Sequence, residues 1–132
     1  MLINIDVDDL DAAIEFYEAA LGLELGRRRF GGAVAEMLGA SSKLYLLAKP
    51  AGSTAFLNSS STRRYDRHWT PVHLDFEVDD VTAAVERAVR AGAKLEGQIE
   101  TRSWGRIATM SDPFGHGFCL LQFVGRGYDE VA

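Results

Sequence analysis

The sequence contains little cysteine and no long apolar run. Cys119 is the single cysteine among 132 residues, so no disulfide can form within the chain and no multi-cysteine zinc site is available. No apolar stretch approaches the roughly 20 residues that a membrane-spanning helix needs. The N-terminus also lacks the basic and apolar regions of a signal peptide. We therefore expect a cytoplasmic protein that has no membrane partner.

Positive charge is scarce as well. Lysine and arginine total 14 residues against 19 aspartates and glutamates, which gives a formal net charge of −5. DNA or RNA would be repelled on average, and no basic patch with interleaved aromatic residues offsets this, so we expect no nucleic acid partner. The composition, 47% apolar and 25% charged, is typical of a globular protein. A chain of this length predicts a single domain over residues 1–132.

The stretch Pro71–Ala93 shows the clearest secondary-structure pattern. Residues 72–78 alternate between apolar and polar side chains, the period of a strand that is buried on one side. Asp79 or Asp80 then caps a helix that we expect to end at Gly92. The polar face of the strand gathers one histidine and two carboxylates. It is either a solvated surface or the floor of a pocket.

The same pattern occurs near the N-terminus. Ile5–Glu15 matches Phe76–Glu86 with a shift of 71 residues, and six of the eleven positions are identical. The first copy has a strand at Leu2–Val7 and a helix that begins after Asp8 or Asp9. Each copy leads into three more strands, so the internal repeat predicts two βαβββ modules. These further strands are expected at Glu24–Phe30, Ala33–Leu38, Lys43–Ala48, Lys94–Thr101, Arg106–Ser111 and Gly117–Val124.

The predicted fold class is α+β. Each module has a curled sheet with a helix on its convex face, and the two modules together form a curled mixed sheet around a cleft. Module one spans about residues 1–50 and module two residues 71–126. Residues 51–70 show no sustained period and are predicted to be a linker or mobile arm. A linker of this length permits the modules to pair within one chain or between two chains.

Two segments carry a resemblance to a known family. VDDLDAAIEFYEAALGLEL at residues 7–25 and DPFGHGFCLLQF at residues 112–123, together with the repeat, resemble the vicinal oxygen chelate superfamily. This group contains glyoxalases, bleomycin-resistance proteins and extradiol dioxygenases, and the chain is most similar to its small glyoxalase-like bacterial members. The resemblance covers nearly the whole chain except the linker. It implies a homodimer with a small organic ligand in the cleft.

The resemblance also bears on metal binding. Members that use a divalent metal place ligands at four equivalent points, which fall here on Leu2, Tyr45, His73 and Cys119. Only His73 matches the family, because Leu2 has no ligand atom and the other two replace the usual carboxylate or amide. Asp75 shares the face of His73 but points away from the standard ligand direction. A catalytic metal needs about three protein ligands, so we expect no metal cofactor, and a divalent metal held by His73 is the alternative.

Several side chains are candidates for a functional role. His73 is the candidate catalytic residue, with Asp75 to orient its imidazole for acid–base chemistry. The alternatives are a histidine that only forms hydrogen bonds and a solvated carboxylate. Cys119 is predicted to be buried and inert rather than nucleophilic. Trp104 is expected near the ligand entrance, where it or Trp69 can stack on a flat ligand, and a core or dimer contact is the alternative.

We predict a small-molecule-binding protein that works without a metal, in the manner of the bleomycin-resistance members. Its cleft would be mainly apolar with one polar corner, and would hold an apolar or aromatic ligand. The alternative is a glyoxalase-like lyase or dioxygenase-like oxidoreductase in which His73 acts on a substrate. A third hypothesis is a module that serves dimerisation or partner binding. The run Arg27–Arg29 is interpreted as solvated surface, although it can also attract an anionic ligand. The predicted ligand-binding residues are Leu2, Tyr45, His73, Asp75, Trp104 and Cys119.

Overall fold

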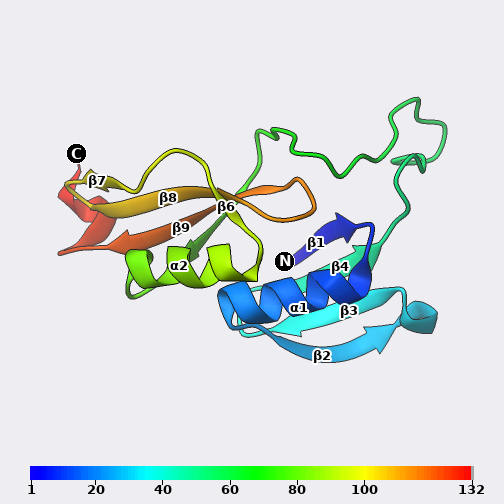
Figure 1. Ribbon diagram of the computed structural model, residues 1–132, viewed down its shortest axis with the longest axis horizontal. Coiled ribbons are helices and arrows are strands. Elements are labelled where there is room, and N and C mark those ends of the chain that lie inside the picture. The colour runs from blue at the N-terminus through cyan, green and yellow to red at the C-terminus, as the bar shows by residue number, and fades with distance from the viewer. Residues whose placement is uncertain (132) are drawn as a thin grey trace. The chain divides into compact units, whose positions relative to one another are not determined.

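The computed structural model describes residues 1–131 and divides the chain into two compact units, Met1–Asp66 and Arg67–Ala132. Each unit has one mixed sheet with one long helix packed on it (Figure 1). The first unit follows the order strand, helix and three strands, and the second follows the same order with one strand divided in two. The predicted α+β class and the two βαβββ modules are therefore confirmed.

The sheet of the first unit has the strand order β1-β4-β3-β2. β1 and β4 are parallel, while the β3–β4 and β2–β3 pairs are antiparallel. A short 3₁₀ turn, η1 (Phe30–Gly32), connects β2 to β3. The other elements are β1 (Leu2–Val7), α1 (Leu10–Leu21), β2 (Glu24–Arg29), β3 (Val34–Leu38) and β4 (Lys43–Ala48).

The period of two along these strands separates a helix face from an open face. Apolar side chains on the helix face are fully buried, and α1 contacts β2, β3 and β4 from that side. Residues paired across a ladder share a face, so the alternate positions of β3 and β4 lie together on the other side of the sheet. The fully buried residues of β3 and β4 are Ala35, Met37, Leu44 and Leu46.

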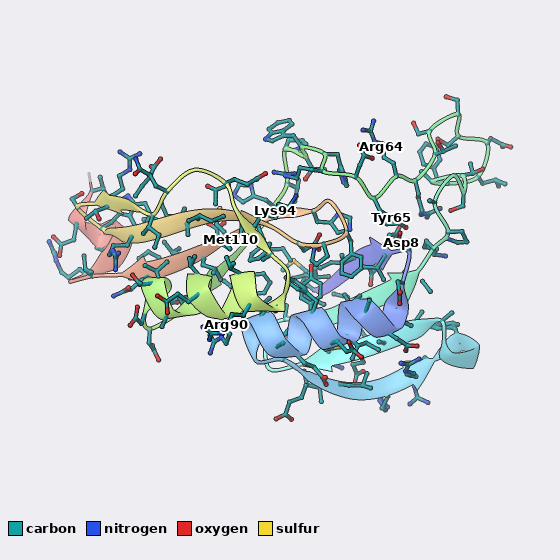
Figure 2. All side chains as sticks on the ribbon, viewed as in Figure 1. Asp8, Arg64, Tyr65, Arg90, Lys94 and Met110 are labelled. Atoms are coloured by element: carbon teal, nitrogen blue, oxygen red, sulfur yellow. The ribbon has the colours of Figure 1, made fainter. Side chains whose placement is uncertain are left out.

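The sheet of the second unit has the strand order β5-β9-β8-β6, and β7 also pairs with β8. Helix α2 packs against β6, β8 and β9. Met110, which Figure 2 labels, is fully buried in β8. The elements are β5 (Leu74–Glu77), α2 (Val81–Ala91), β6 (Lys94–Leu95), β7 (Glu100–Arg102), β8 (Gly105–Ser111), β9 (Gly117–Phe123) and the 3₁₀ turn η2 (Gly127–Glu130).

Two predicted strands of this unit are wrong in extent. β5 begins at Leu74, and Val72, which the alternation placed on the buried face, is 79% exposed. Pro71 offers no backbone N–H, and the ladder with β9 starts only at Leu74. The strand predicted at Lys94–Thr101 is divided between β6 and β7. Gly97 lies between them with a φ of +88°, a left-handed conformation that interrupts an extended chain.

The ends of both helices were predicted correctly. The carboxylates of Asp9 and Asp80 each accept the backbone N–H of the residue three positions on, at 3.0 and 3.1 Å. Gly22 and Gly92 end the two helices in left-handed conformations, with φ of 67° and 116°. The N-caps lie 71 positions apart and the C-caps 70, so the repeat is present in the backbone as well as in the sequence. Neither helix of the described chain is long and apolar enough to cross a membrane.

The segment predicted to be a linker is divided between the units. Its residues up to Asp66 belong to the first unit, where the only regular feature is an isolated bridge between Thr54 and Thr62. The Arg63 guanidinium donates to the carboxylate of Asp6 on β1 at 2.7 Å and to the carbonyl of Ala55 at 3.1 Å. Through Arg63, this part of the segment is tied to the edge strand of the first sheet.

Replacing Asp80 with alanine should destabilise the protein by about 1 kcal/mol, because the first turn of α2 loses the acceptor for an otherwise unbonded N–H. The free energy of unfolding in urea, followed by circular dichroism, measures this loss. Asp79→Ala is the matched control, since the exposed Asp79 lies outside α2 and is not its cap. Equal losses in the two variants would contradict the cap assignment.

Candidate functional site

The open face of the first sheet carries a cavity of about 390 Å³. All four strands contribute to its lining. Leu2 and Tyr45, both predicted to bind ligand, are among the lining residues. The ladder register places Tyr45 between Asn4 and Glu36, and Glu36, Tyr45 and Arg27 form a polar strip across this surface. The cavity is lined by Leu2, Asn4, Arg27, Arg29, Phe30, Val34, Glu36, Tyr45 and Leu47.

The polar strip is centred on the buried carboxylate of Glu36, which is only 6% exposed. Arg27 donates to it from Nη2 at 3.0 Å and from Nε at 3.4 Å, and the Tyr45 hydroxyl donates at 3.2 Å. The hydrogen bond from Arg27 holds the pKa of Glu36 below its usual value, against the opposing effect of burial. Glu36 is therefore a carboxylate at neutral pH, and the Tyr45 hydroxyl is oriented toward it.

The three consecutive arginines of β2 have different environments. Arg27 pairs with Glu36, and Arg28 pairs with Asp11 of α1. The guanidinium of Arg29 makes no ion pair or hydrogen bond with any residue in the described part of the chain, and it lines the cavity. The run is thus not a uniform solvated surface, because two of its members line a cavity.

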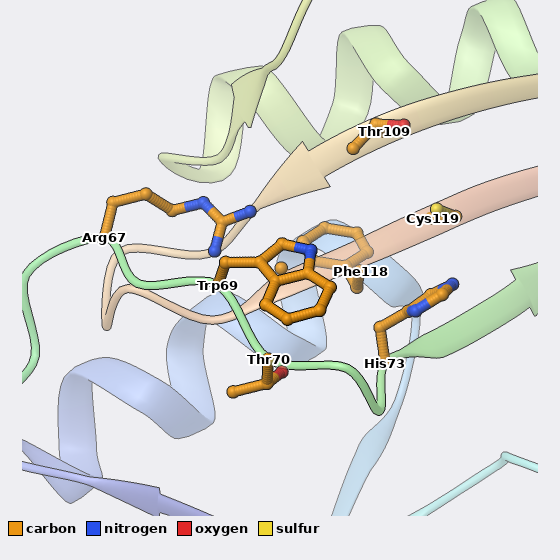
Figure 3. A pocket seen from close by; sticks show the side chains of 8 residues that line it. Arg67, Trp69, Thr70, His73, Thr109, Phe118 and Cys119 are labelled. Carbon is orange, nitrogen blue, oxygen red and sulfur yellow. The ribbon is translucent and has the colours of Figure 1, made fainter.

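The second unit has a smaller pocket of about 190 Å³ (Figure 3). Trp69 and His73 reach it from the segment that leads into β5, while Thr109 comes from β8 and Cys119 from β9. His73 and Cys119 were both predicted to bind ligand. The pocket is lined by Arg67, Trp69, Thr70, His73, Thr109, Gly117, Phe118 and Cys119.

Three potential metal ligands meet beside this pocket. Nε2 of His73 lies 3.3 Å from Oδ1 of Asp75, and Asp75 is the register partner of Cys119 on the neighbouring strand. One ligand atom from each of the three residues lies within 4.8 Å of the others. The sequence predicted that Asp75 points away from the standard ligand direction, but the structure brings its carboxylate next to the imidazole. The group can orient the histidine for proton transfer.

Cys119 is buried, as predicted. Burial raises the pKa of its thiol to about 11, and the negative charge of Asp75 adds to the rise. The thiol therefore stays protonated near neutral pH, where a nucleophile or a metal ligand would have to be a thiolate.

The two tryptophans lie in different parts of the second unit. Trp104 packs against Tyr128 and Phe123, with ring centroids 5.1 and 6.2 Å apart, and lines neither of the two cavities described above. This is a packing contact of the kind that the sequence left open as the alternative. Trp69 lines the pocket of the second unit and is 78% exposed, so it is the tryptophan placed to meet a ligand there.

Sequence reasoning missed Glu36, and it interpreted Arg27 and Arg67 as solvated surface that can also attract an anion. Glu36 and Arg27 form the polar strip of the first cavity, and Arg67 lines the second pocket while it pairs with Glu96 at 2.8 Å from both Nε and Nη2. One signal for Glu36 was present, because a carboxylate at an alternate position of an apolar strand faces away from the helix. No sequence signal indicates its pairing with Arg27.

Two units of repeated βαβββ order, each with a mixed sheet and a pocket, are typical of the glyoxalase-like class of protein. The chain belongs to the glyoxalase-like domain family, whose profile matches residues 2–121.

Individual proteins resemble the chain over most of its length. An uncharacterized protein of Mycobacterium bovis is 34% identical over 137 residues, which cover 95% of this chain and 84% of that protein. The anthracycline biosynthesis protein DnrV of Streptomyces peucetius is 29% identical over 131 residues, 98% of this chain and 43% of that protein. A glyoxalase/bleomycin resistance protein/dioxygenase family enzyme from Burkholderia phytofirmans shares the fold, with a TM-score of 0.71 at 19% identity, covering 93% of this chain and 97% of that one.

The metal site that the superfamily implies does not fit the first unit. Leu2 has no donor atom, and the hydroxyl of Tyr45 is bonded to Glu36. In the second unit, His73 and Cys119 occupy the other two positions, and Asp75 adds a third possible ligand. The four-point set is therefore absent, although the described part of the second unit retains a three-residue group.

Native Cys119 should react with iodoacetamide at pH 8 at least about tenfold more slowly than the same cysteine in urea. A pKa of about 11 in place of the ordinary 9.0 lowers the thiolate fraction, and burial limits access. Labelling followed by mass spectrometry measures the rate. Asp75→Asn should speed native labelling, because it removes a negative charge that raises the pKa. Equal native and denatured rates would refute the assignment.

Proposed function

We propose that this chain is a small-molecule-binding protein of the glyoxalase and bleomycin-resistance type that acts without a metal. The observation that carries the proposal is the cavity on the open face of the first sheet. Its volume of about 390 Å³ falls in the range of roughly 300–1,000 Å³ that is usual for sites of organic ligands. The pocket of the second unit, at about 190 Å³, falls below that range.

The lining of this cavity suits an apolar or aromatic ligand. Leu2 and Phe30 are 60% and 83% exposed, so a ligand that covers them removes apolar surface from water. Leu47 extends this wall on β4. The strip formed by Arg27, Glu36 and Tyr45 supplies the few polar groups that orient a ligand in such a site.

The comparisons support a role with small organic molecules. The Streptomyces peucetius relative is named as an anthracycline biosynthesis protein, and this chain matches about two fifths of its length. The absence of the four-point metal set supports binding over metal-dependent catalysis, since Leu2 and Tyr45 have no free donor for a cation.

A neutral flat probe, 2-naphthamide, should bind the full chain, and Leu47→Asp should weaken that binding by at least about tenfold. The substitution places a charge in the apolar wall, where the ring would desolvate it. Isothermal titration calorimetry measures the affinity. Leu57→Asp is the matched control, because Leu57 is 88% exposed in the same unit and lines neither cavity. If the wild-type chain gives no heat of binding, or if both variants lose it equally, the proposal is wrong.

A second candidate is a glyoxalase-like or dioxygenase-like enzyme that uses His73. The group of His73, Asp75 and Cys119 favours it, because an imidazole, a carboxylate and a thiolate are a ligand set that zinc and related ions accept. A metal bound there would polarise a substrate oxygen. Trp69 would cover the substrate from the side of the pocket opening, and Asp75 would hold the imidazole in place.

Metal analysis separates the two candidates. Chain purified without chelator should contain far less than one equivalent of Zn, Ni, Mn or Fe, and titration with Co²⁺ should give no thiolate charge-transfer absorption. The raised pKa of Cys119 opposes the deprotonation that a cobalt–sulfur bond requires. Stoichiometric metal that is lost in His73→Ala but kept in His116→Ala would instead establish the second candidate.

A further inference from the structure

We propose that the cavity of the first unit selects planar molecules that carry a carboxylate, with the carboxylate on Arg29 and the ring against the apolar wall around Leu47. The ligand class is thus an aromatic acid rather than a neutral aromatic compound. This inference rests on the proposed function, and it adds the charge and the orientation of the ligand.

The strand register places a single cation at one end of an apolar row. Arg29 of β2 is the partner of Val34 on β3, and Val34 is in turn the partner of Leu47 on β4. Partners across a ladder share a face and lie about 5 Å apart, so the three side chains follow one another across the open face. A flat molecule that covers Val34 and Leu47 has its edge within reach of the Arg29 guanidinium.

The charges that line the cavity do not balance. Arg27, Arg29 and Glu36 are its charged lining residues. Arg27 compensates Glu36 through two hydrogen bonds, so the buried carboxylate does not repel an incoming anion as a free charge would. Arg29 has no counter-charge within residues 1–131. The cavity therefore has one spare positive charge in a chain whose formal net charge is −5.

Guanidinium geometry makes a carboxylate the preferred anion of this size. Arg29 can present two parallel N–H donors to the two oxygens of a carboxylate, and such charge-assisted pairs are about twice as strong as neutral hydrogen bonds. Phe30 follows Arg29 directly and lines the same cavity. Its φ of +53° is uncommon for a residue other than glycine, and its side chain is 83% exposed. An aromatic ligand can therefore contact Phe30 with its ring while Arg29 binds its acid group.

The test compares 2-naphthoate with 2-naphthamide, which have the same ring system and differ in charge. Calorimetry on the full chain should give naphthoate an affinity on the order of tenfold higher, and added salt should reduce this preference. Arg29→Gln should abolish the preference, so that the variant binds the two probes with equal affinity. Arg28→Gln is the matched control, because Arg28 lies in the same run but pairs with α1 and does not line the cavity.

The outcomes distinguish this inference from the proposed function. Equal affinities of wild-type chain for the two probes would overturn the selection of acids while the binding function stands. A preference for naphthoate that survives Arg29→Gln, or that Arg28→Gln removes equally, would overturn the role of Arg29. A chain that binds neither probe would overturn both proposals together.

Discussion

Coverage of one sheet face by a single helix is the constraint on which the rest of this structure depends. In the first unit, α1 packs on three of the four strands and fully buries the alternate residues of β3 and β4. The intervening residues point to the other side because the side-chain period of a strand is two. The helix thus decides which positions must be apolar and leaves the opposite set free for recognition. The cavity lined by Tyr45 and Leu47 consists of this second set.

The repeat preserves the scaffold but not the chemistry of the open faces. Asp9 and Asp80 cap their helices with the same hydrogen bond, and Gly22 and Gly92 end them in the same left-handed conformation. The strand positions related by the same shift differ, since Leu2 corresponds to His73. Each unit has consequently acquired its own polar group, a buried carboxylate paired with an exposed arginine in the first and an imidazole beside a carboxylate in the second. Function in such a fold must be argued from each face separately.

The sequence predicted the features that depend on residues adjacent in the chain, such as strand bounds. It missed the side-chain contacts that depend on how the strands pair. Strands Leu2–Val7 and Lys43–Ala48 were predicted to the residue, because alternation and flanking turns define them. The approach of His73 to Asp75 depends only on local spacing, since His73 directly precedes β5 and Asp75 lies two positions on within it. The pairing of Arg27 with Glu36 depends on the register between β2 and β3, which shifts at a bulge between Leu25 and Arg28. A bulge of this kind cannot be recognised from the alternation of apolar and polar residues in the sequence.

That register is the physical basis of the proposal that the first unit binds its ligand without a metal. The superfamily resemblance places a metal ligand at Tyr45, but here the Tyr45 hydroxyl donates to Glu36, and the negative charge of Glu36 is taken up by Arg27. A divalent cation at this point would have to displace a guanidinium that already makes two hydrogen bonds to a buried carboxylate. Fixed positive charge on β2 therefore lies beside the position to which the resemblance assigns a metal ligand. Such a charge cannot polarise a substrate oxygen as a Lewis acid does, but it can hold an anion in place. For this reason we propose binding rather than catalysis for this face of the sheet.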